Sequence, residues 1–433
     1  MKMLLGVLSL LLSTALLLTG HGMQLTLLPL RAAENGLSEL LIGFSASAYF
    51  LGFVAGCFGN PRLVARIGHI RAFAVLTALM ICAILCLELT NHWAAWLALR
   101  FLTGVSICGL YTVIESWLNS QVTAQSRGRV LSVYTFITLS AMTGGQFLIN
   151  VGPVSSSVPF TVAALCMALA ILPVGLTRRM APEPVEATHT GFSLLLQRSR
   201  SAFAGALLSG LVTGSFWSLG AVFARRYSED QFDITLFMSI AIAGGALVQY
   251  PIGWLSDRVD RRRVLILLAV GCLLSSVAVA LSTEQAWFLV TVALFGATAM
   301  PLYAISLATA ADVAESSEFV TLGTSVLMLN ALGAAIAPLF LGQLMSHLAA
   351  TALFWSFAVL SALFGIYLLT QLRSPRAVSV TEQTPFLVAG NDAAPAAFEM
   401  DPRQDDEGGT DNAITTAIKD ADQQTDGSQP PHN

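Results

Sequence analysis

The amino-acid sequence predicts an all-α membrane protein with twelve transmembrane helices arranged as two six-helix bundles. Three observations support this fold class: an apolar composition, a series of long apolar runs and an internal repeat. Of the 433 residues, 55% are hydrophobic and only 11% are charged. Because soluble domains carry roughly 25% charged residues, this composition excludes a water-soluble globular protein.

Twelve apolar runs follow one another along the chain. Runs of about 20 residues are long enough to cross a hydrocarbon core of about 30 Å. They must form helices, because lipid offers the backbone no hydrogen-bond partners. The predicted helices span residues 4–30, 38–60, 72–90, 93–118, 130–151, 159–177, 201–223, 234–255, 264–282, 286–310, 320–345 and 350–372.

Basic residues predict the orientation of these helices. With the N-terminus in the cytoplasm, only Arg31, Arg225 and Arg226 of the membrane segment lie on the other side. Apart from the intramembrane Arg100, the other basic residues then face the cytoplasm, as the positive-inside rule requires. The sequence therefore predicts a multi-pass protein of the cytoplasmic (inner) membrane with both termini in the cytoplasm. A loop at 311–319 is the exception, since it carries acidic residues such as Asp312 and no basic one.

Composition divides the chain into four parts. Residues 1–177 and 201–372 are the predicted N-terminal and C-terminal six-helix bundles, and residues 178–200 are a cytoplasmic linker between them. Residues 373–433 hold four basic and eleven acidic residues and are rich in Pro, Gly and Asp. Such a segment buries too little apolar surface to fold, so it predicts a disordered acidic cytoplasmic tail.

The two predicted bundles look like copies of one unit. A shift of 192 residues aligns Arg66 with Arg258, Arg71 with Arg263, Gly104 with Gly296, and Leu110-Tyr111 with Leu302-Tyr303. Because each unit has an even number of helices, both copies have the same orientation in the membrane. The sequence thus predicts a parallel repeat about a pseudo-twofold axis normal to the bilayer.

Several classes of function are excluded. Lys2 and Lys419 are the only lysines, so the basic surface of a nucleic-acid-binding protein is absent. The six cysteines lie in apolar runs without Cys-x-x-Cys spacing, which favours buried thiols over a metal site. The sequence has no phosphate-binding loop and no His-Glu-x-x-His or Gly-x-Ser-x-Gly motif. It therefore predicts no enzyme activity, no cofactor and no ATP coupling.

A loop motif between the eighth and ninth predicted helices carries a family resemblance. It reads Gly253-Trp-Leu-Ser-Asp257-Arg258-Val-Asp260-Arg261-Arg262-Arg263. This resembles the loop signature Gly-x-x-x-Asp-Arg-x-Gly-Arg-Arg of the major facilitator superfamily, with Asp260 in place of the last glycine. The matching stretch of the first half has Ala65 where the signature has aspartate. The resemblance covers residues 1–372.

Other segments refine this resemblance. Arg100-Phe-Leu-Thr-Gly104 is similar to the superfamily's intramembrane Arg-x-x-x-Gly element. Gly144-Gly145 lacks the preceding Gly-Pro of the superfamily's antiporter element, which disfavours drug-proton exchange of the usual kind. A bacterial subfamily of poorly defined substrate is indicated by three further segments, Val113-Ile-Glu115-Ser-Trp-Leu118, Arg127-Gly-Arg129 and Gln249-Tyr-Pro-Ile-Gly253.

The resemblance implies a secondary active transporter that moves a small organic solute by alternating access and is coupled to protons. In this superfamily helices 1, 4, 7 and 10 line the substrate cavity. The polar and aromatic candidates on those helices are Gln24, Arg100, Thr103, Tyr111, Thr213, Trp217, Ser218, Thr298 and Tyr303. Such a protein is expected to bind a small-molecule substrate and membrane lipid, and to be a monomer.

Arg100 is a candidate for binding an anionic group or for tuning a nearby proton carrier. It lies seven residues into the fourth predicted helix, about 10 Å from the outer end of that helix. A guanidinium at that depth is costly unless it faces water, a carboxylate or a substrate. The alternative is a side chain that snorkels to the membrane surface.

His21 and Glu115 are the candidate proton-coupling residues. Histidine changes charge near neutral pH, but a lone intramembrane histidine such as His21 also serves as a hydrogen-bonded packing residue. Glu115 belongs to the cytoplasmic end of the fourth predicted helix. Its alternative role is an ion pair that closes the inner gate, with Arg62, Arg66 or Arg127.

The charges of the loop motif are candidates for that gate. Charge-assisted pairs at helix ends can differ between two arrangements of the bundles and so bias one of them. The gating candidates are Asp257, Arg258, Arg261 and Arg262, with Arg66 and Arg71 in the first half. The alternative is a set of arginines that only anchors short loops to anionic headgroups.

A second function stays open on the same fold. A non-transporting membrane receptor or scaffold would use the acidic tail at 373–433 as a partner-binding arm. Removal of residues 377–433 distinguishes the two, because a transporter keeps its flux whereas a tail-dependent scaffold loses its phenotype.

Overall fold

The computed structural model describes residues 2–121, 127–176, 189–372, 383, 384, 386, 395 and 398. Within these residues the chain is helical and has no strand. The first half contains α1 (Lys2–Glu34), α2 (Glu39–Ile67), α3 (His69–Leu89), α4 (Trp93–Ser120), α5 (Arg127–Leu148) and α6 (Val158–Gly175). The second half contains α7 (Phe192–Arg198), α8 (Arg200–Ala224), α9 (Gln231–Ser256), α10 (Arg261–Leu281), α11 (Gln285–Ala299), α12 (Pro301–Ala311), α13 (Phe319–His347) and α14 (Ala352–Gln371).

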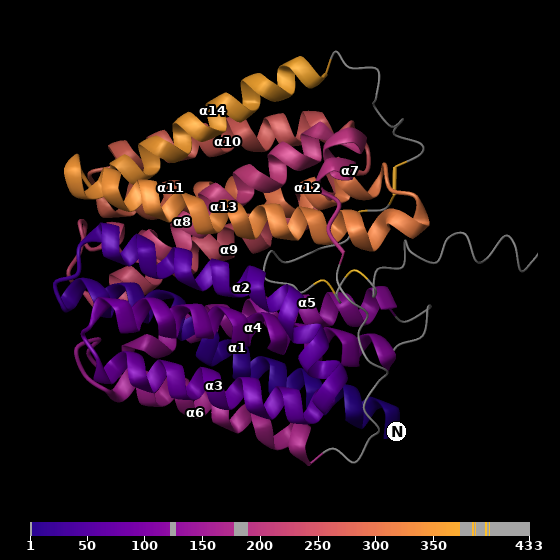
Figure 1. The fold of residues 1–433 in the computed structure, drawn as a ribbon. Helices are drawn as coiled ribbons and strands as arrows, with labels where there is room; N and C mark the ends of the chain where they lie inside the picture. The colour runs from indigo at the N-terminus through magenta and orange to yellow at the C-terminus, as the bar shows by residue number, and fades with distance from the viewer. Residues whose placement is uncertain are drawn as a thin grey trace, which may run out of the picture.

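The helices form two bundles that lie side by side, α1 to α6 in one and α8 to α14 in the other (Figure 1). Eleven segments among the described residues are long and apolar enough to cross a membrane, and α11 and α12 together make one of them. The remaining long helix, α5, packs against α1 and α9. The predicted fold class of two six-helix bundles is confirmed.

Local sequence sets where several helices begin. The side chains of Ser38, Ser199 and Asp230 accept hydrogen bonds from backbone N–H groups in the first turns of α2, α8 and α9. These N-caps satisfy donors that have no partner inside the helix. Pro301 lacks a backbone N–H, and the tenth span is divided at that point into α11 and α12.

Glycines let helices touch in equivalent places of the two bundles. A Cβ atom on Gly104 in α4 would overlap the carbonyl oxygen of Tyr49 in α2. A Cβ atom on Gly296 in α11 would overlap the carbonyl oxygen of Ala241 in α9. Both members of the second contact lie 192 positions after those of the first. The predicted repeat is therefore present in the helix packing, and it fixes how α4 lies against α2.

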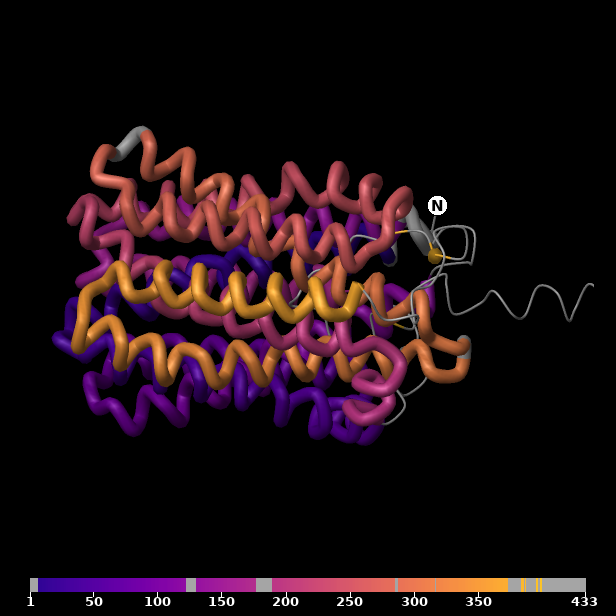
Figure 2. The backbone as a smooth tube through the Cα atoms, turned by 90° about the horizontal axis from the view of Figure 1, so that it is seen from above, coloured from indigo at the N-terminus to yellow at the C-terminus, as the bar shows by residue number. Residues whose placement is uncertain are grey.

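The two ends of the bundles differ in charge. Arg66, Arg71 and Arg198 lie at helix ends on one face, with the arginines of the 258–263 loop. We call this the arginine-rich face. The start of α1 and the last turn of α14 lie at the same end of the molecule (Figures 1 and 2).

The two bundles are joined tightly at the opposite face. A Cβ atom on Gly43 in α2 would overlap the carbonyl oxygen of Pro338 in α13. The amide of Asn150 donates a hydrogen bond of 2.9 Å to the hydroxyl of Thr235 in α9. The side chain of Gln231 donates to the carbonyl oxygen of Ile149 over 2.7 Å. These contacts hold α2 and the end of α5 against the C-terminal bundle.

The glycine contact between α2 and α4 gives a test of the packing. We expect Gly104→Ala to lower the free energy of unfolding by about 1–3 kcal/mol, because the added methyl group forces the two backbones apart. The matched control is Gly144→Ala on α5, where an added Cβ meets no atom within 4 Å. Detergent-solubilised protein unfolded by heat or denaturant gives both values. Equal stability of the two variants would contradict this packing.

Candidate functional site

Four polar side chains form a cluster inside the N-terminal bundle: His21 and Gln24 on α1, Tyr49 on α2 and Arg100 on α4. Each is at most 5% exposed. His21 Nδ1 lies 2.6 Å from Gln24 Nε2, and His21 Nε2 lies 3.3 Å from the Tyr49 hydroxyl oxygen. The guanidinium carbon of Arg100 lies 4.5 Å from the centre of the Tyr49 ring. Tyr49 therefore connects Arg100 to His21.

Arg100 is buried with an incomplete set of partners. The close approach at Gly104 brings α4 against the backbone of Tyr49, so the guanidinium lies over the Tyr49 ring in a cation–π contact. Its Nη1 atom is buried and has no hydrogen-bond partner among the described residues. The side chain does not snorkel to a surface. It instead leaves one donor of a buried cation available.

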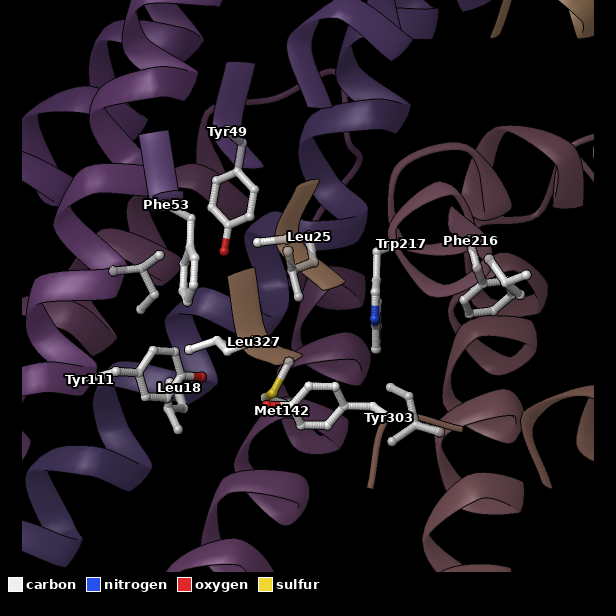
Figure 3. Packing of buried hydrophobic residues seen from close by; sticks show 14 of the residues in the cluster. Leu18, Leu25, Tyr49, Phe53, Tyr111, Met142, Phe216, Trp217, Tyr303 and Leu327 are labelled. Carbon is white, nitrogen blue, oxygen red and sulfur yellow. The ribbon is translucent and has the colours of Figure 1, made fainter. Parts of the chain in front are cut away.

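A small cavity lies between the two bundles beside Tyr49. It measures about 20 Å³, which is room for about one water molecule. Figure 3 shows Tyr49 on one side and Trp217 on the other. Trp217 Nε1 and Asn330 Oδ1 are buried without a hydrogen-bond partner in the described part of the chain. The lining residues are Tyr49, Phe50, Phe53, Thr213, Gly214, Trp217, Asn330, Ala331 and Ala334.

A second charged cluster lies at the arginine-rich face of the C-terminal bundle. Arg261 Nη1 lies 3.0 Å from Asp312 Oδ1, and their side chains are 2% and 4% exposed. Arg261 Nη2 lies 3.4 Å from Asp257 Oδ1. The pair with Asp312 joins the start of α10 to the end of α12. We refer to Asp257, Arg261 and Asp312 as the gate cluster.

Asp260 has a separate structural role in this loop. Its carboxylate caps α10 by accepting from the backbone N–H of Arg262, and it lies 2.8 Å from Arg262 Nη2. Burial raises the pKa of the Asp260 carboxyl, but the hydrogen bonds from Arg262 outweigh burial and hold that pKa below its ordinary value. An ionised cap at a helix N-terminus also interacts favourably with the helix dipole.

The comparisons with known proteins agree with this architecture. The family model of the Major Facilitator Superfamily matches residues 10–321 and 202–402. The chain belongs to the major facilitator superfamily. A relative from Escherichia fergusonii, named as an uncharacterized MFS-type transporter YcaD, is 30% identical over 374 residues, which cover 86% of this chain and 96% of the relative. The protein of that name from Escherichia coli is 30% identical over 369 residues, covering 84% and 95%.

Solved structures of this superfamily share the fold. The nucleoside transporter NupG has a TM-score of 0.74 at 14% identity, covering 85% of this chain and 99% of NupG. A bacterial homolog of the human lysosomal transporter Spinster, in an inward-facing and occupied conformation, has a TM-score of 0.68 at 15% identity, covering 86% and 98%. A D-xylose-proton symporter has a TM-score of 0.65 at 12% identity, covering 87% and 99%. This protein is therefore a membrane transporter of the superfamily rather than an enzyme.

The predicted cavity residues lie in different places. Thr213 and Trp217 line the cavity between the bundles, and Gln24 lies in the polar cluster. Tyr111 and Tyr303 are both buried, on α4 and α12 (Figure 3).

The other three predicted residues, Thr103, Ser218 and Thr298, form hydrogen bonds within their own bundles. The hydroxyls of Thr103 and Ser218 donate to backbone carbonyls one turn earlier in α4 and α8. Thr298 Oγ1 lies 3.2 Å from Ser275 Oγ on α10. The hydroxyl of Thr298 therefore contacts another helix of the C-terminal bundle, and its place in the substrate cavity stays a prediction.

Glu115 lies apart from the polar cluster. It is fully buried on α4 and accepts a hydrogen bond of 3.1 Å from the hydroxyl of Tyr134 on α5. The side chain of Arg127, one of its predicted partners, lies outside the described residues. Arg62 and Arg66 are exposed at the end of α2. Of the two predicted proton-coupling residues, only His21 lies beside Arg100.

The remaining gating candidates are more exposed than the gate cluster. Arg66 and Arg71 are exposed and form no ion pair with a described residue. The guanidinium of Arg258 lies 3.9 Å from the centre of the Trp254 ring. In the first half, His69 occupies the repeat position of Arg261 and lies 2.9 Å from the hydroxyl of Ser116. Among the described residues, the buried ion pair at the arginine-rich face therefore belongs to the C-terminal bundle.

Sequence reasoning missed Tyr49, Asn330 and Asp312. Tyr49 and Asn330 lie on α2 and α13, outside the four helices that the superfamily resemblance assigns to the cavity. Asp312 did have a signal, because the loop at 311–319, predicted to be cytoplasmic, has acidic residues and no basic one. That loop is acidic because Asp312 pairs with a buried arginine of the neighbouring loop.

The buried ion pair of the gate cluster gives a second test. We expect Asp312→Asn to lower the free energy of unfolding by up to about 3–5 kcal/mol, since it removes the nearer carboxylate partner of the buried Arg261 and leaves only the longer contact with Asp257. Denaturant unfolding in detergent measures this loss. The matched control is Glu315→Gln in the same loop, whose side chain is 64% exposed in its pair with Arg198. We expect the control to change little. An equally small effect of Asp312→Asn would contradict the buried ion pair between Arg261 and Asp312.

Proposed function

We propose that this transporter moves a small organic anion together with a proton across the cytoplasmic membrane by alternating access of its two bundles. The observation that carries the proposal is the buried cluster of Arg100, Tyr49 and His21, which meets the cavity between the bundles at Tyr49. Arg100 supplies a permanent charge and an available donor, and His21 supplies a group that can take up a proton.

The electrostatics of this cluster favour an anion. A guanidinium in low dielectric lacks the solvation of water, so a carboxylate or similar group that pairs with it recovers part of that loss. The aromatic rings of Tyr49 and Trp217 on either side of the cavity suit the apolar part of such a solute. Trp217 Nε1 and Asn330 Oδ1 are available to fix its orientation.

The same geometry couples the proton to the solute. A protonated His21 beside Arg100 places two positive charges close together without a counter-ion, which is unfavourable. An anion bound at Arg100 neutralises one of these charges and makes protonation of His21 easier. Binding of the anion and of the proton therefore favour each other, as reciprocal linkage requires. A D-xylose-proton symporter of the same fold supports proton coupling by analogy.

The placement of the arginines sets the orientation of the two bundles in the membrane that we propose. We assign the arginine-rich face to the cytoplasm by the positive-inside rule. The bundles are then sealed at the outer face, where Gly43 meets Pro338 and Asn150 bonds Thr235. These contacts support our proposal that this arrangement of the bundles is the one that faces the cytoplasm. Rearrangement of the gate cluster would accompany closure of the cytoplasmic face, with Asp257, the half-exposed member, as the acid that changes partner.

A ligand screen tests the substrate class. We expect organic anions at about a hundred times their dissociation constant to stabilise the wild-type protein by about 2.7 kcal/mol in a thermal-shift assay. Arg100→Gln should lose this response, because the anion loses its counter-charge. The matched control is Arg226→Gln, which removes an exposed arginine outside the site. Neutral or cationic ligands that stabilise Arg100→Gln as well as the wild type would overturn the proposal.

A further inference from the structure

Described residues beyond α14 bind the gate cluster. The backbone N–H and the hydroxyl of Thr384 both donate to Asp312 Oδ1, each over 3.0 Å. The backbone N–H of Phe386 donates to Asp257 Oδ1 over 2.9 Å. Arg261 donates to the carbonyl oxygen of Thr384. All three members of the gate cluster are therefore engaged by the segment that was predicted to be disordered.

Phe386 places its ring on the face of α9 that looks toward the N-terminal bundle. The ring lies where a Cβ atom on Gly253 would be. Gly253 is 18 residues beyond Thr235, which is about five helical turns, so the two residues share one face of α9. Thr235 is the residue that bonds Asn150 of the N-terminal bundle at the opposite face. Phe386 therefore lies on the stripe of α9 that meets α5.

The ring of Phe398 packs against α13 in a similar way. It is only 3% exposed, and its ring lies against Gly323. Gly323 precedes Asn330 by seven residues and Ala334 by eleven, which is about two and three helical turns. Asn330 and Ala334 line the cavity between the bundles, opposite Tyr49 on α2. Phe398 therefore lies on the stripe of α13 that meets α2.

The register of α2 and α13 shows that Phe398 takes the place of a partner from the other bundle. At the opposite face, Gly43 of α2 meets Pro338 of α13. Fifteen residues nearer the arginine-rich face, the same antiparallel register pairs Phe58 with Gly323. Phe58 is 42% exposed, whereas Phe398 fills the space at Gly323.

We propose that the segment carrying Thr384, Phe386 and Phe398 is an intramolecular wedge that holds the two bundles apart at the arginine-rich face. Both rings cover stripes of α9 and α13 that α5 and α2 must meet when that face closes. The backbone of the wedge also occupies the carboxylates of Asp257 and Asp312. Closure therefore requires the wedge to leave, and the wedge acts as a brake on the transport cycle.

Cross-linking tests where the wedge lies. In a background without the exposed or half-exposed Cys82, Cys86 and Cys166, Gly323→Cys combined with Phe398→Cys should form a disulfide on mild oxidation, detected by mass spectrometry of tryptic peptides. Leu348→Cys combined with Phe398→Cys is the control, because Leu348 is exposed at the opposite face. Absence of the disulfide between positions 323 and 398, or equal yield in the control, would overturn the placement.

Distances between two spin labels, measured by double electron–electron resonance, test whether the wedge acts as a brake, and they require no ligand. Spin labels at Leu176→Cys and Thr370→Cys, at the ends of α6 and α14 on the arginine-rich face, report the separation of the bundles in lipid nanodiscs. With the intact wedge we expect the long distance alone. The double variant Phe386→Ala and Phe398→Ala should add a population at shorter distance, because the face is then free to close.

The matched control keeps the wedge and removes the rest of the tail. A chain ending at residue 401 should give the same distance distribution as the full chain. The brake is refuted if the phenylalanine variant leaves the distribution unchanged, or if the shortened chain shows the same new population. Neither result depends on solute binding, so failure of the wedge and failure of the proposed anion transport are distinguishable.

Discussion

The burial of one permanent charge, the guanidinium of Arg100, is the constraint on which the candidate site depends. A cation inside a helix bundle costs several kcal/mol unless neighbours compensate it. The glycine contact at Gly104 supplies one compensation, because it brings the Tyr49 ring beneath the charge. The surrounding bundle supplies no carboxylate for Nη1 among the described residues. The anion site that we propose rests on this unpartnered donor of a buried cation.

The two halves of the repeat share their backbone packing but differ in their buried polar and charged residues. The repeat positions of Arg100, Tyr49 and Gln24 are taken in the second half by Val292, Ala241 and Phe216. There the aromatic rings of the C-terminal bundle pack against one another, for example Phe216 and Phe295 in a tilted contact at 5.3 Å between centres. Conversely, the gate cluster has uncharged or weakly basic counterparts in the first half, Ala65, His69 and Ser120. The N-terminal bundle thus holds the buried cation Arg100, and the C-terminal bundle holds the buried ion pair of Arg261 and Asp312.

The sequence predicts much of the fold because lipid leaves few choices. Apolar length identifies the spans, and arginine placement predicts their orientation. The 192-residue shift aligns Gly104 with Gly296, and in the structure these two glycines make equivalent close contacts with Tyr49 and Ala241. The site is harder to predict, because a polar residue in a span gives no sign of the direction in which its side chain points. Thr298 faces α10 for that reason. The contacts of Thr384, Phe386 and Phe398 are harder still, since single aromatic rings in a polar, acidic segment leave no periodic pattern.

Proton movement measured together with solute movement tests the account most directly. Proteoliposomes that enclose a pH-sensitive dye would receive, on the outside, an anion identified by ligand-induced stabilisation. Uptake of the anion should acidify the interior in step with its accumulation, and His21→Gln should uncouple or abolish both signals. Accumulation of the anion by the wild-type protein with no change of internal pH would contradict the coupling of Arg100 and His21.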